Sequence, residues 1–386
     1  MAREKRGAYG RAIRSALEQA QQVAGGRLSA EQVEPICRDL LAAPAAHRQL
    51  YLRNSRRCRR PEVVQRLIAA SREVVHCDAR EALRRAEAAV SAADALPVEP
   101  PLAALGSDLR CEARVCLADA LRVHGQLRRA EAEIGMAVRA ATLGSGDALL
   151  WASLRRARGS LRRDLGQFEG AQADLEGAAA DFHRLGELHV SGMTLLALGY
   201  TQYMAGNSSA AFHSTLEAGA RLDPELDPMM NLGLLHSQFL YLADLGEDRL
   251  ALGLLGSFAH LYSLLGAEML ELRARWAVGR LFLDRERWGQ AMAQLEPVRR
   301  ELAARGLTFD AALAGLDLAL AYAGARRPLE VRKLALEMYD VFFSEAVPRE
   351  AWATLTLFVK AADELRADLG LMRQWLQALE PRNFSG

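Results

Sequence analysis

One phrase of about fifteen residues recurs six times along this chain. The copies begin at residues 124, 165, 205, 245, 285 and 325 and can be laid over one another without gaps. Their aligned small position is Ala130, Ala171, Ala211, Ala251, Ala291 and Val331. A nearly constant period of about 40 residues is typical of chains that stack one supersecondary unit many times. The repeat therefore predicts an elongated array, for which 386 residues provide ample length.

Each copy has the pattern of two helices joined by a tight turn. Five residues before the small residue stand Gly125, Gly166, Gly206 and Gly246, which Glu286 and Arg326 replace in the last two copies. Glycine adopts the left-handed conformation that ends a helix without steric cost. Apolar residues then follow at three- and four-residue spacing, as on the buried side of a helix. Because strand signals are nearly absent, we expect an all-α fold.

The repeat divides most of the chain into helix pairs. We expect them at about residues 61–96, 108–143, 147–185, 188–222, 228–265, 268–305 and 309–344, with a capping pair at 349–381. The first pair fits less well, and a proline-containing link at 97–107 absorbs its extra length. Residues 1–60 are expected to form a basic helical region with helices at about 8–24 and 30–42, the second opening with a capping box of Ser29 and Gln32.

The recurring phrase resembles the signature of the tetratricopeptide repeat (TPR) superfamily, in a long-period bacterial version. The matching positions are Leu198, Gly199, Gly206 and Ala211 in one copy, Val278, Gly279, Trp288 and Ala291 in another, and Gly159, Gly166, Phe168 and Ala171 in a third. Ser208, Pro328 and Val331 depart from it. HEAT and armadillo arrays have similar periods but lack this phrase. The resemblance covers residues 61–381 and implies a right-handed α-α superhelical solenoid of TPR-like helix pairs, with a concave groove lined by the first helices.

Composition indicates a cytoplasmic protein. The five cysteines form no CxxC pair, which is typical of free thiols in a reducing compartment. The first residues lack the apolar core of a signal peptide. Two stretches, 188–216 and 250–267, contain no Asp, Glu, Lys or Arg, but polar residues and glycines interrupt them. They predict buried helices and no membrane contact.

Nothing in the sequence predicts catalysis. There is no GxSxG, P-loop, HExxH or dinucleotide-binding motif, and no cysteine lies in a zinc-like grouping with histidine. His76 and Cys77 are adjacent on a predicted helix and therefore point about 100° apart. We expect no enzyme activity, no catalytic residues, no cofactor and no metal.

Binding candidates follow from the resemblance, which places the first helices of each pair along the groove. Carried over by position, they are Arg156, Arg163, Met193, Leu196, Tyr200, Tyr203, His236, Leu240, Arg273, Trp276 and Arg280. Arginine among aromatic and aliphatic residues suits a protein or peptide with acidic and apolar side chains. In the segment 154–163 the helical phase separates Arg155, Arg158 and Arg162 from Arg156 and Arg163, and only the last two are placed in the groove.

Residues 1–60 contain thirteen Arg or Lys and five Asp or Glu, a net charge of +8. Within them Arg53, Arg56, Arg57, Arg59 and Arg60 form a basic cluster that could contact the phosphates of nucleic acid. The sequence thus leaves two hypotheses. The first is a protein- or peptide-binding scaffold or regulatory adaptor in bacterial signalling. The second is a peptide-sensing regulator whose basic N-terminal region contacts DNA or RNA. Homo-oligomerisation stays open.

Overall fold

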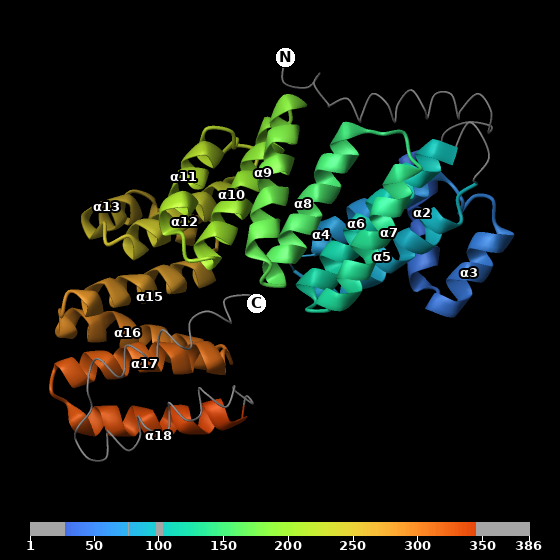
Figure 1. Ribbon diagram of the computed structural model, residues 1–386. Helices are drawn as coiled ribbons and strands as arrows, with labels where there is room; N and C mark the ends of the chain where they lie inside the picture. The colour runs from blue at the N-terminus through green and yellow to red at the C-terminus, as the bar shows by residue number, and fades with distance from the viewer. Residues whose placement is uncertain (1–27, 76, 98–102, 345–386) are drawn as a thin grey trace. The chain divides into compact units, whose positions relative to one another are not determined.

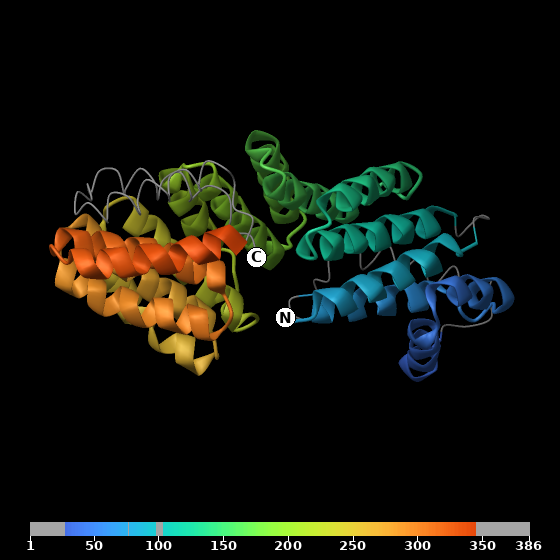
Figure 2. The same cartoon turned by 90° about the horizontal axis from the view of Figure 1, so that it is seen from below.

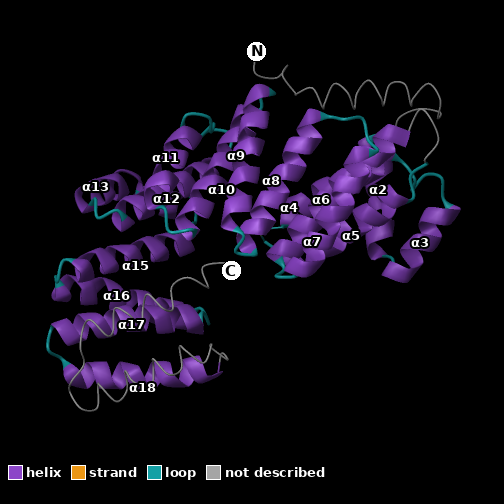
Figure 3. Cartoon of the chain, viewed as in Figure 1, coloured by secondary structure: helices purple, strands orange, loops and turns teal. Residues whose placement is uncertain are grey.

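The computed structural model describes residues 28–75, 77–97 and 103–344, and within these ranges every regular element is a helix (Figure 3). The helix expected at 8–24 and the capping pair expected at 349–381 lie outside the described residues. The chain divides into an N-terminal unit, residues 1–223, and a C-terminal unit, residues 224–386.

The described part of the N-terminal unit consists of two short helices followed by four helix pairs (Figure 1). Its helices are α2 (Ala30–Ala42), α3 (Ala45–Asn54), α4 (Pro61–Val74), α5 (Ala79–Asp94), α6 (Ala103–Val123), α7 (Leu127–Thr142), α8 (Ala148–Asp164), α9 (Phe168–Arg184), α10 (Leu188–Met204) and α11 (Ser208–Gly219). Each first helix packs on its own second helix, and α4, α6, α8 and α10 contact one another in sequence. The pairs therefore stack side by side, as the blue to green helices show from below (Figure 2).

The two helices of a pair approach most closely at the small residues of the repeat. Ala171 and Ala211 are fully buried. A Cβ atom on Gly159 would lie 2.8 Å from Leu175 Cγ, and one on Gly199 would lie 3.0 Å from the carbonyl oxygen of Ala211. Both distances are shorter than ordinary van der Waals contact, so only glycine lets α8 and α10 come this close to their partners.

Within the C-terminal unit, helix pairs stack in the same way. Its described helices are α12 (Pro228–Asp244), α13 (Asp248–Phe258), α14 (His260–Leu264), α15 (Glu268–Asp284), α16 (Trp288–Ala304), α17 (Thr308–Gly324) and α18 (Pro328–Ser344). The second helix of the first pair is broken into α13 and α14. A Cβ atom on Gly279 would lie 2.6 Å from Leu295 Cδ2, which repeats the close contact of Gly159 with Leu175 in a later copy.

The turns inside the helix pairs share one backbone geometry. Gly125, Gly166, Gly206 and Gly246 have φ between 74° and 81°, in the left-handed region. In the turn after α8, for example, the amide N–H of Gln167 donates to the carbonyl of Arg162 at 2.8 Å, as in a Schellman motif. This turn chemistry confirms the helix–turn–helix prediction from the glycine pattern.

The segment before residue 60 differs from its prediction in one respect. Helix α2 begins at Ala30, and Gln32 Oε1 accepts a hydrogen bond from the Ser29 amide at 3.0 Å, as the capping box predicts. Helix α3, however, was not predicted. Its apolar residues do not form one buried side, since Leu52 is buried whereas Leu50 and Tyr51 are about half exposed.

The link between the first two helix pairs is shorter than predicted. Helix α6 begins at Ala103, inside the predicted link 97–107.

Side chains from α2 and α3 belong to the same hydrophobic core as the first helix pairs. Val33, Cys37 and Leu40 of α2 and Leu52 of α3 cluster with Val63 and other residues of α4 to α8. The described part of the basic region therefore packs onto the repeats.

Candidate functional site

Helix α8 carries five arginines, and three of them bind the second helix of the same pair. Arg155 pairs with Asp181 at 2.8 Å, while Arg158 and Arg162 both pair with Asp174, at 2.5 Å and 2.7 Å. Asp174 is almost completely buried. These charges therefore join α8 to α9, which agrees with the separation expected from the helical phase.

Arg163 lies on the other face of α8 and joins it to α10. Its Nε donates to Asp164 Oδ1 at 2.7 Å, and its guanidinium carbon lies 5.1 Å from the centroid of the Tyr200 ring. An arginine over a tyrosine ring at this distance gives a favourable cation–π contact, which orients both side chains.

Arg156 shares that face but has no comparable carboxylate. Its guanidinium carbon lies 5.9 Å from the centroid of the buried Phe182 ring, and among the described residues it makes no ion pair. Burial lowers the pKa of the half-buried Arg156, while Asp119 acts in the opposite direction and Arg72 and Arg122 add to the lowering. Because an arginine keeps its proton in proteins, Arg156 is a cation to which no described carboxylate binds directly.

The charged groups that act on Arg156 come from the two preceding first helices, α4 and α6. Arg122 of α6 pairs with Asp119 at 2.8 Å and with Asp164 of α8 at 2.9 Å, and Arg72 of α4 pairs with Glu112 at 3.1 Å. We call the set that crosses α4, α6, α8 and α10 the arginine strip; it comprises Arg72, Glu112, Asp119, Arg122, Arg156, Arg163, Asp164 and Tyr200. Four guanidinium groups face three carboxylates, so the strip has one net positive charge, and Arg156 is the arginine that has no carboxylate partner among the described residues.

Five members of the strip were missed by sequence reasoning, namely Arg72, Glu112, Asp119, Arg122 and Asp164. Arg122 precedes Arg163 by the same step that separates Ala130 from Ala171, so the repeat phase contained the signal. Arg72 lies in the first pair, which is out of register with the others.

Apolar and aromatic residues adjoin the strip on α10. Met193, Leu196, Tyr200 and Tyr203 are spaced by three or four residues and therefore share one side of the helix. All four are half-buried. Of these candidates the structure brings Arg163 and Tyr200 into contact, and Arg156 lies two turns before Arg163 on α8.

Candidates in the C-terminal unit are more deeply buried. Arg156, Leu196, His236 and Trp276 follow one another at the repeat step, so all four occupy one repeat position. His236 is 5 % exposed and Trp276 is 7 % exposed. Trp276 Nε1 donates to the buried Asp317 Oδ2 at 2.6 Å, which joins α15 to α17. Trp276 therefore packs in the core and presents little surface to a partner.

The His236 side chain is buried and hydrogen-bonded, and it does not provide a charged group at the surface. Its Nδ1 lies 2.7 Å from Tyr262 Oη. Burial lowers the pKa of His236 to about 4, with a smaller contribution from the Arg273 charge. The imidazole is therefore neutral at pH 7. Leu240, Arg273 and Arg280 are half-buried.

The basic cluster lies at the end of α3 and in the turn that follows. Arg53, Arg56 and Arg57 are exposed and form no ion pair within the described ranges. Arg59 and Arg60 are half-buried, and Arg60 Nε lies 3.6 Å from Glu62 Oε2. The five residues thus differ in accessibility.

Ionisable groups suited to metal binding or nucleophilic chemistry do not gather in the described part of the chain. No group of three His, Cys, Asp or Glu residues there could hold a metal ion. Burial raises the pKa of the Cys37 thiol to about 11 and that of Cys111 to about 12, so both are protonated at neutral pH. Nor does any described helix combine the length and apolar character needed to cross a bilayer.

Comparison with known proteins places this geometry in a structural class. No protein-family model matches the sequence, and no curated protein matches it. Among solved structures, a Rap protein complexed with Competence and Sporulation Factor superposes with a TM-score of 0.58 at 13% identity, covering 84% of this chain and 88% of that one. The chain is a helical repeat protein. It has an all-α superhelical repeat fold.

Two further matches have lower TM-scores. A STAND protein with a tetratricopeptide repeat sensor from Pyrococcus horikoshii gives 0.41 at 15% identity, covering 96% of this chain and 52% of that one. The P58(IPK) TPR domain gives 0.21 at 12% identity, covering 82% and 96%.

Proposed function

We propose that this TPR-like protein is a non-catalytic scaffold or regulatory adaptor that binds a protein or peptide with acidic and apolar side chains. The partner's carboxylate would pair with Arg156, and its apolar side chains would pack beside Leu196 and Tyr200 on α10. The observation that carries the proposal is the half-buried guanidinium of Arg156, which has no carboxylate partner among the described residues.

The repeat position of Arg156 strengthens this assignment. In the copies where the chain has His236 and Trp276 at this position, the side chain is buried and uncharged at pH 7. Arg156 places a charged side chain at a repeat position where those copies have buried, uncharged side chains. Residues that depart in this way from the pattern of the other copies are expected at functional sites. A carboxylate brought by a partner would remove the conflict, because it would supply the missing counterion.

The neighbouring contacts favour one kind of ligand group. Arg72, Arg122 and Arg163 already pair with Glu112, Asp119 and Asp164, so a single carboxylate suffices to balance the strip. Since an ion pair fixes position and apolar contacts supply most of the affinity, α10 would contribute the larger share of binding energy. The Rap protein with a similar fold is complexed with Competence and Sporulation Factor, which is consistent with partner binding on such a fold.

A charge-dependent peptide assay tests the proposal. Short labelled peptides containing Glu and Leu, and matched peptides with Lys in place of Glu, are titrated against the full-length protein by fluorescence anisotropy. We expect the acidic set to contain binders, and Arg156→Gln to weaken them by about tenfold or more, as the loss of one charged hydrogen bond implies.

Arg155→Gln is the matched control, because Arg155 lies on the same helix but pairs with Asp181 of α9. It should leave peptide affinity within about twofold of wild type. Equal loss in both variants, or a preference for the Lys peptides, would overturn the proposal.

The alternative function, contact with nucleic acid, is supported by a separate observation. Arg53, Arg56 and Arg57 are exposed and without ion pairs in the described residues, as phosphate-binding side chains would be. Binding to random duplex DNA that falls steeply with salt, and that the triple change to Ala abolishes, would favour this alternative.

A further inference from the structure

A concave site lies between α2, α4 and α5, apart from the arginine strip. The cavity has a volume of about 370 Å³, within the range of small-molecule sites. None of the residues that line it belongs to the strip. Its charged lining groups are Glu34, Arg38, Arg66, Glu81, Arg84 and Arg85. Four guanidinium groups against two carboxylates give the cavity a net charge of +2.

Both carboxylates of the cavity are already bound by its arginines. Glu81 accepts two hydrogen bonds from Arg84, at 2.7 Å and 2.8 Å, and one from Arg85 at 2.7 Å. These bonds, that from Arg84 first, lower the pKa of Glu81 to about 2. Glu34 accepts from Arg66 Nε at 2.8 Å. Because these pairs form without a ligand, they hold the guanidinium groups in place beforehand.

Backbone carbonyls fix two of these arginines further. Arg84 Nη1 donates to the carbonyl of Leu41 at 2.5 Å, and Arg85 Nη1 donates to the carbonyl of Ala70 at 2.9 Å. The Nη2 group of Arg85 makes no hydrogen bond with the described residues. Donors therefore remain available at positions that the protein has already ordered.

Two further residues of the cavity lining are Arg38, which is the fourth arginine, and Cys37. Arg38 of α2 is exposed, and its guanidinium group makes no ion pair or hydrogen bond with the side chains or backbone of the described residues. The Cys37 thiol, which also lines the cavity, donates to the carbonyl of Val63 at 3.8 Å. Since burial raises the pKa of Cys37, the thiol stays neutral and adds no charge that would repel an anion.

We propose that this cavity binds a small phosphate monoester in its dianionic form, with Arg38 as the principal ligand and Arg66 and Arg85 as supporting ligands. The planar guanidinium group matches the spacing of phosphate oxygens. A dianion balances the net charge of the cavity. A phosphate also presents several oxygens on one atom, so that guanidinium groups from three helices can contact it at once.

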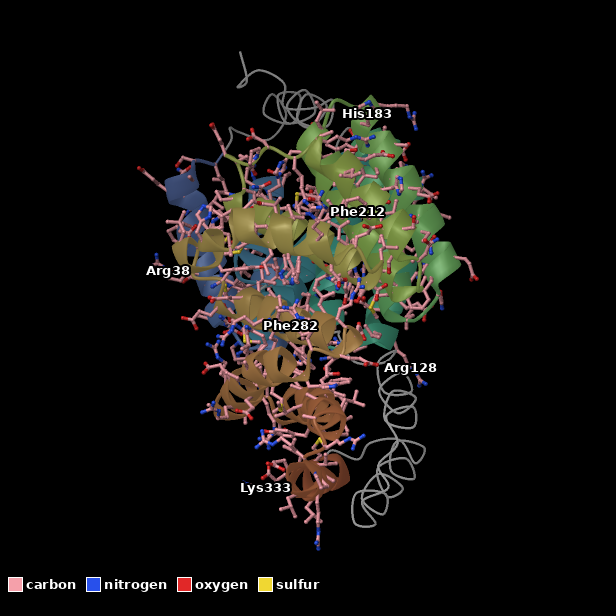
Figure 4. The ribbon with its side chains drawn as sticks, turned by 90° about the vertical axis from the view of Figure 1, so that its left-hand side faces the viewer. Arg38, Arg128, His183, Phe212, Phe282 and Lys333 are labelled. Carbon is pink, nitrogen blue, oxygen red and sulfur yellow. The ribbon has the colours of Figure 1, made fainter. Side chains whose placement is uncertain are left out.

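Calorimetric titration of the full-length protein tests the proposal with inorganic phosphate and glycerol 3-phosphate at constant ionic strength. We expect saturable binding at pH 7.5 that weakens at pH 5, where phosphate monoesters become monoanions. Arg38→Ala should weaken binding by about tenfold or more. Arg128→Ala is the control, because Arg128 is an exposed arginine of α7 that also makes no ion pair with described residues; both are labelled in Figure 4.

A second variant separates ligand binding from structural effects. Arg66 pairs with two carboxylates, Glu34 at 2.8 Å and Glu73 at 3.3 Å. Glu34→Gln removes the nearer one, which also lines the cavity, so phosphate should bind several-fold more tightly, which a damaged fold would not produce. Absence of binding at millimolar phosphate, equal affinities for Arg38→Ala and wild type, or tighter binding of succinate than of glycerol 3-phosphate would overturn the assignment.

Discussion

At the scale of single residues, one repeat position holds side chains that respond differently to burial. Arg156 and His236 stand two repeats apart in equivalent places. The buried histidine stays neutral and forms one hydrogen bond with Tyr262. Arginine cannot lose its proton, so burial leaves Arg156 charged, and no described carboxylate pairs with it. This difference in titration chemistry is why Arg156, and not His236, is the better candidate for binding.

The buried imidazole of His236 predicts a loss of stability in acid. Its pKa is about 4 in the folded chain, against an ordinary value of 6.5. Between these values the unfolded state binds more protons than the folded state, so the stabilisation present above pH 6.5 is lost as pH falls toward 4. From pH 7 to pH 5 the free energy of unfolding should fall by about 2 kcal/mol because of this residue.

Urea unfolding at the two pH values, followed by tryptophan fluorescence, measures the effect. His236→Gln keeps a hydrogen-bonding group near Tyr262 but does not titrate, so the variant should lose about 2 kcal/mol less than wild type between pH 7 and pH 5. His260→Gln, at an exposed histidine of the same unit, should behave as wild type. If all three proteins show the same pH dependence, His236 is not the responsible group.

At the scale of elements, the turn inside each pair keeps its geometry even where glycine is lost. Glu286 and Arg326 adopt φ of 55° and 54°, in the left-handed region that side chains disfavour. The residue after each is an arginine stacked on an aromatic ring at the end of the preceding helix, Arg287 over Phe282 at 4.9 Å and Arg327 over Tyr322 at 5.1 Å. These contacts occupy the place where a Schellman turn usually has an apolar contact, and they offset part of the strain.

Replacing Glu286 with glycine should therefore stabilise the protein. Relief of the left-handed strain outweighs the extra entropy of glycine in the unfolded chain, for a net gain of about 0.5–1 kcal/mol. Denaturant unfolding midpoints measure the change. Glu286→Ala removes the same side chain but keeps a Cβ atom, so it should not stabilise.

Gly166→Ala supplies the opposite test in another copy of the turn. Gly166 has φ of 74°, and a Cβ atom there would meet nothing within 4 Å, so backbone strain is the sole cost. We expect a loss of about 1 kcal/mol. A gain from this change, or no gain from Glu286→Gly, would show that the turn does not impose the left-handed conformation.

At the scale of the whole molecule, sequence periodicity was enough to predict the fold class but not the partners of individual side chains. The glycine and alanine positions recur because two backbones must approach closely there, as at Gly159 and Ala171, and this requirement is visible in one sequence. The pairing of Arg122 with Asp164 of the next helix pair depends on how consecutive pairs stack, which local patterns do not encode. The same holds for the burial of Trp276. Helix α3 escaped prediction because it lacks an apolar side.

Each unit contains a hydrophobic cluster of its own among the described residues. One cluster includes residues of α2 to α8, such as Leu67 and Leu109, and another includes residues of α15 to α18, such as Leu295 and Val331. In repeat arrays stability is approximately a sum of local terms and nearest-neighbour contacts. Damage in one pair should therefore spread to adjacent pairs and not to the entire chain.

Two equivalent substitutions test this locality. Leu175 of α9 and Leu295 of α16 occupy the same repeat position, are both fully buried, and both lie against the glycine of their first helix. Leu295→Ala should cost about 2–5 kcal/mol locally, because it leaves a cavity between α15 and α16. Hydrogen exchange followed by mass spectrometry should show faster exchange in α15 to α17, with α4 to α7 unchanged. Leu175→Ala should instead speed exchange in α8 to α10 and leave α16 to α18 unchanged. Uniform acceleration along the chain in either variant would mean that the helix pairs unfold as one cooperative body.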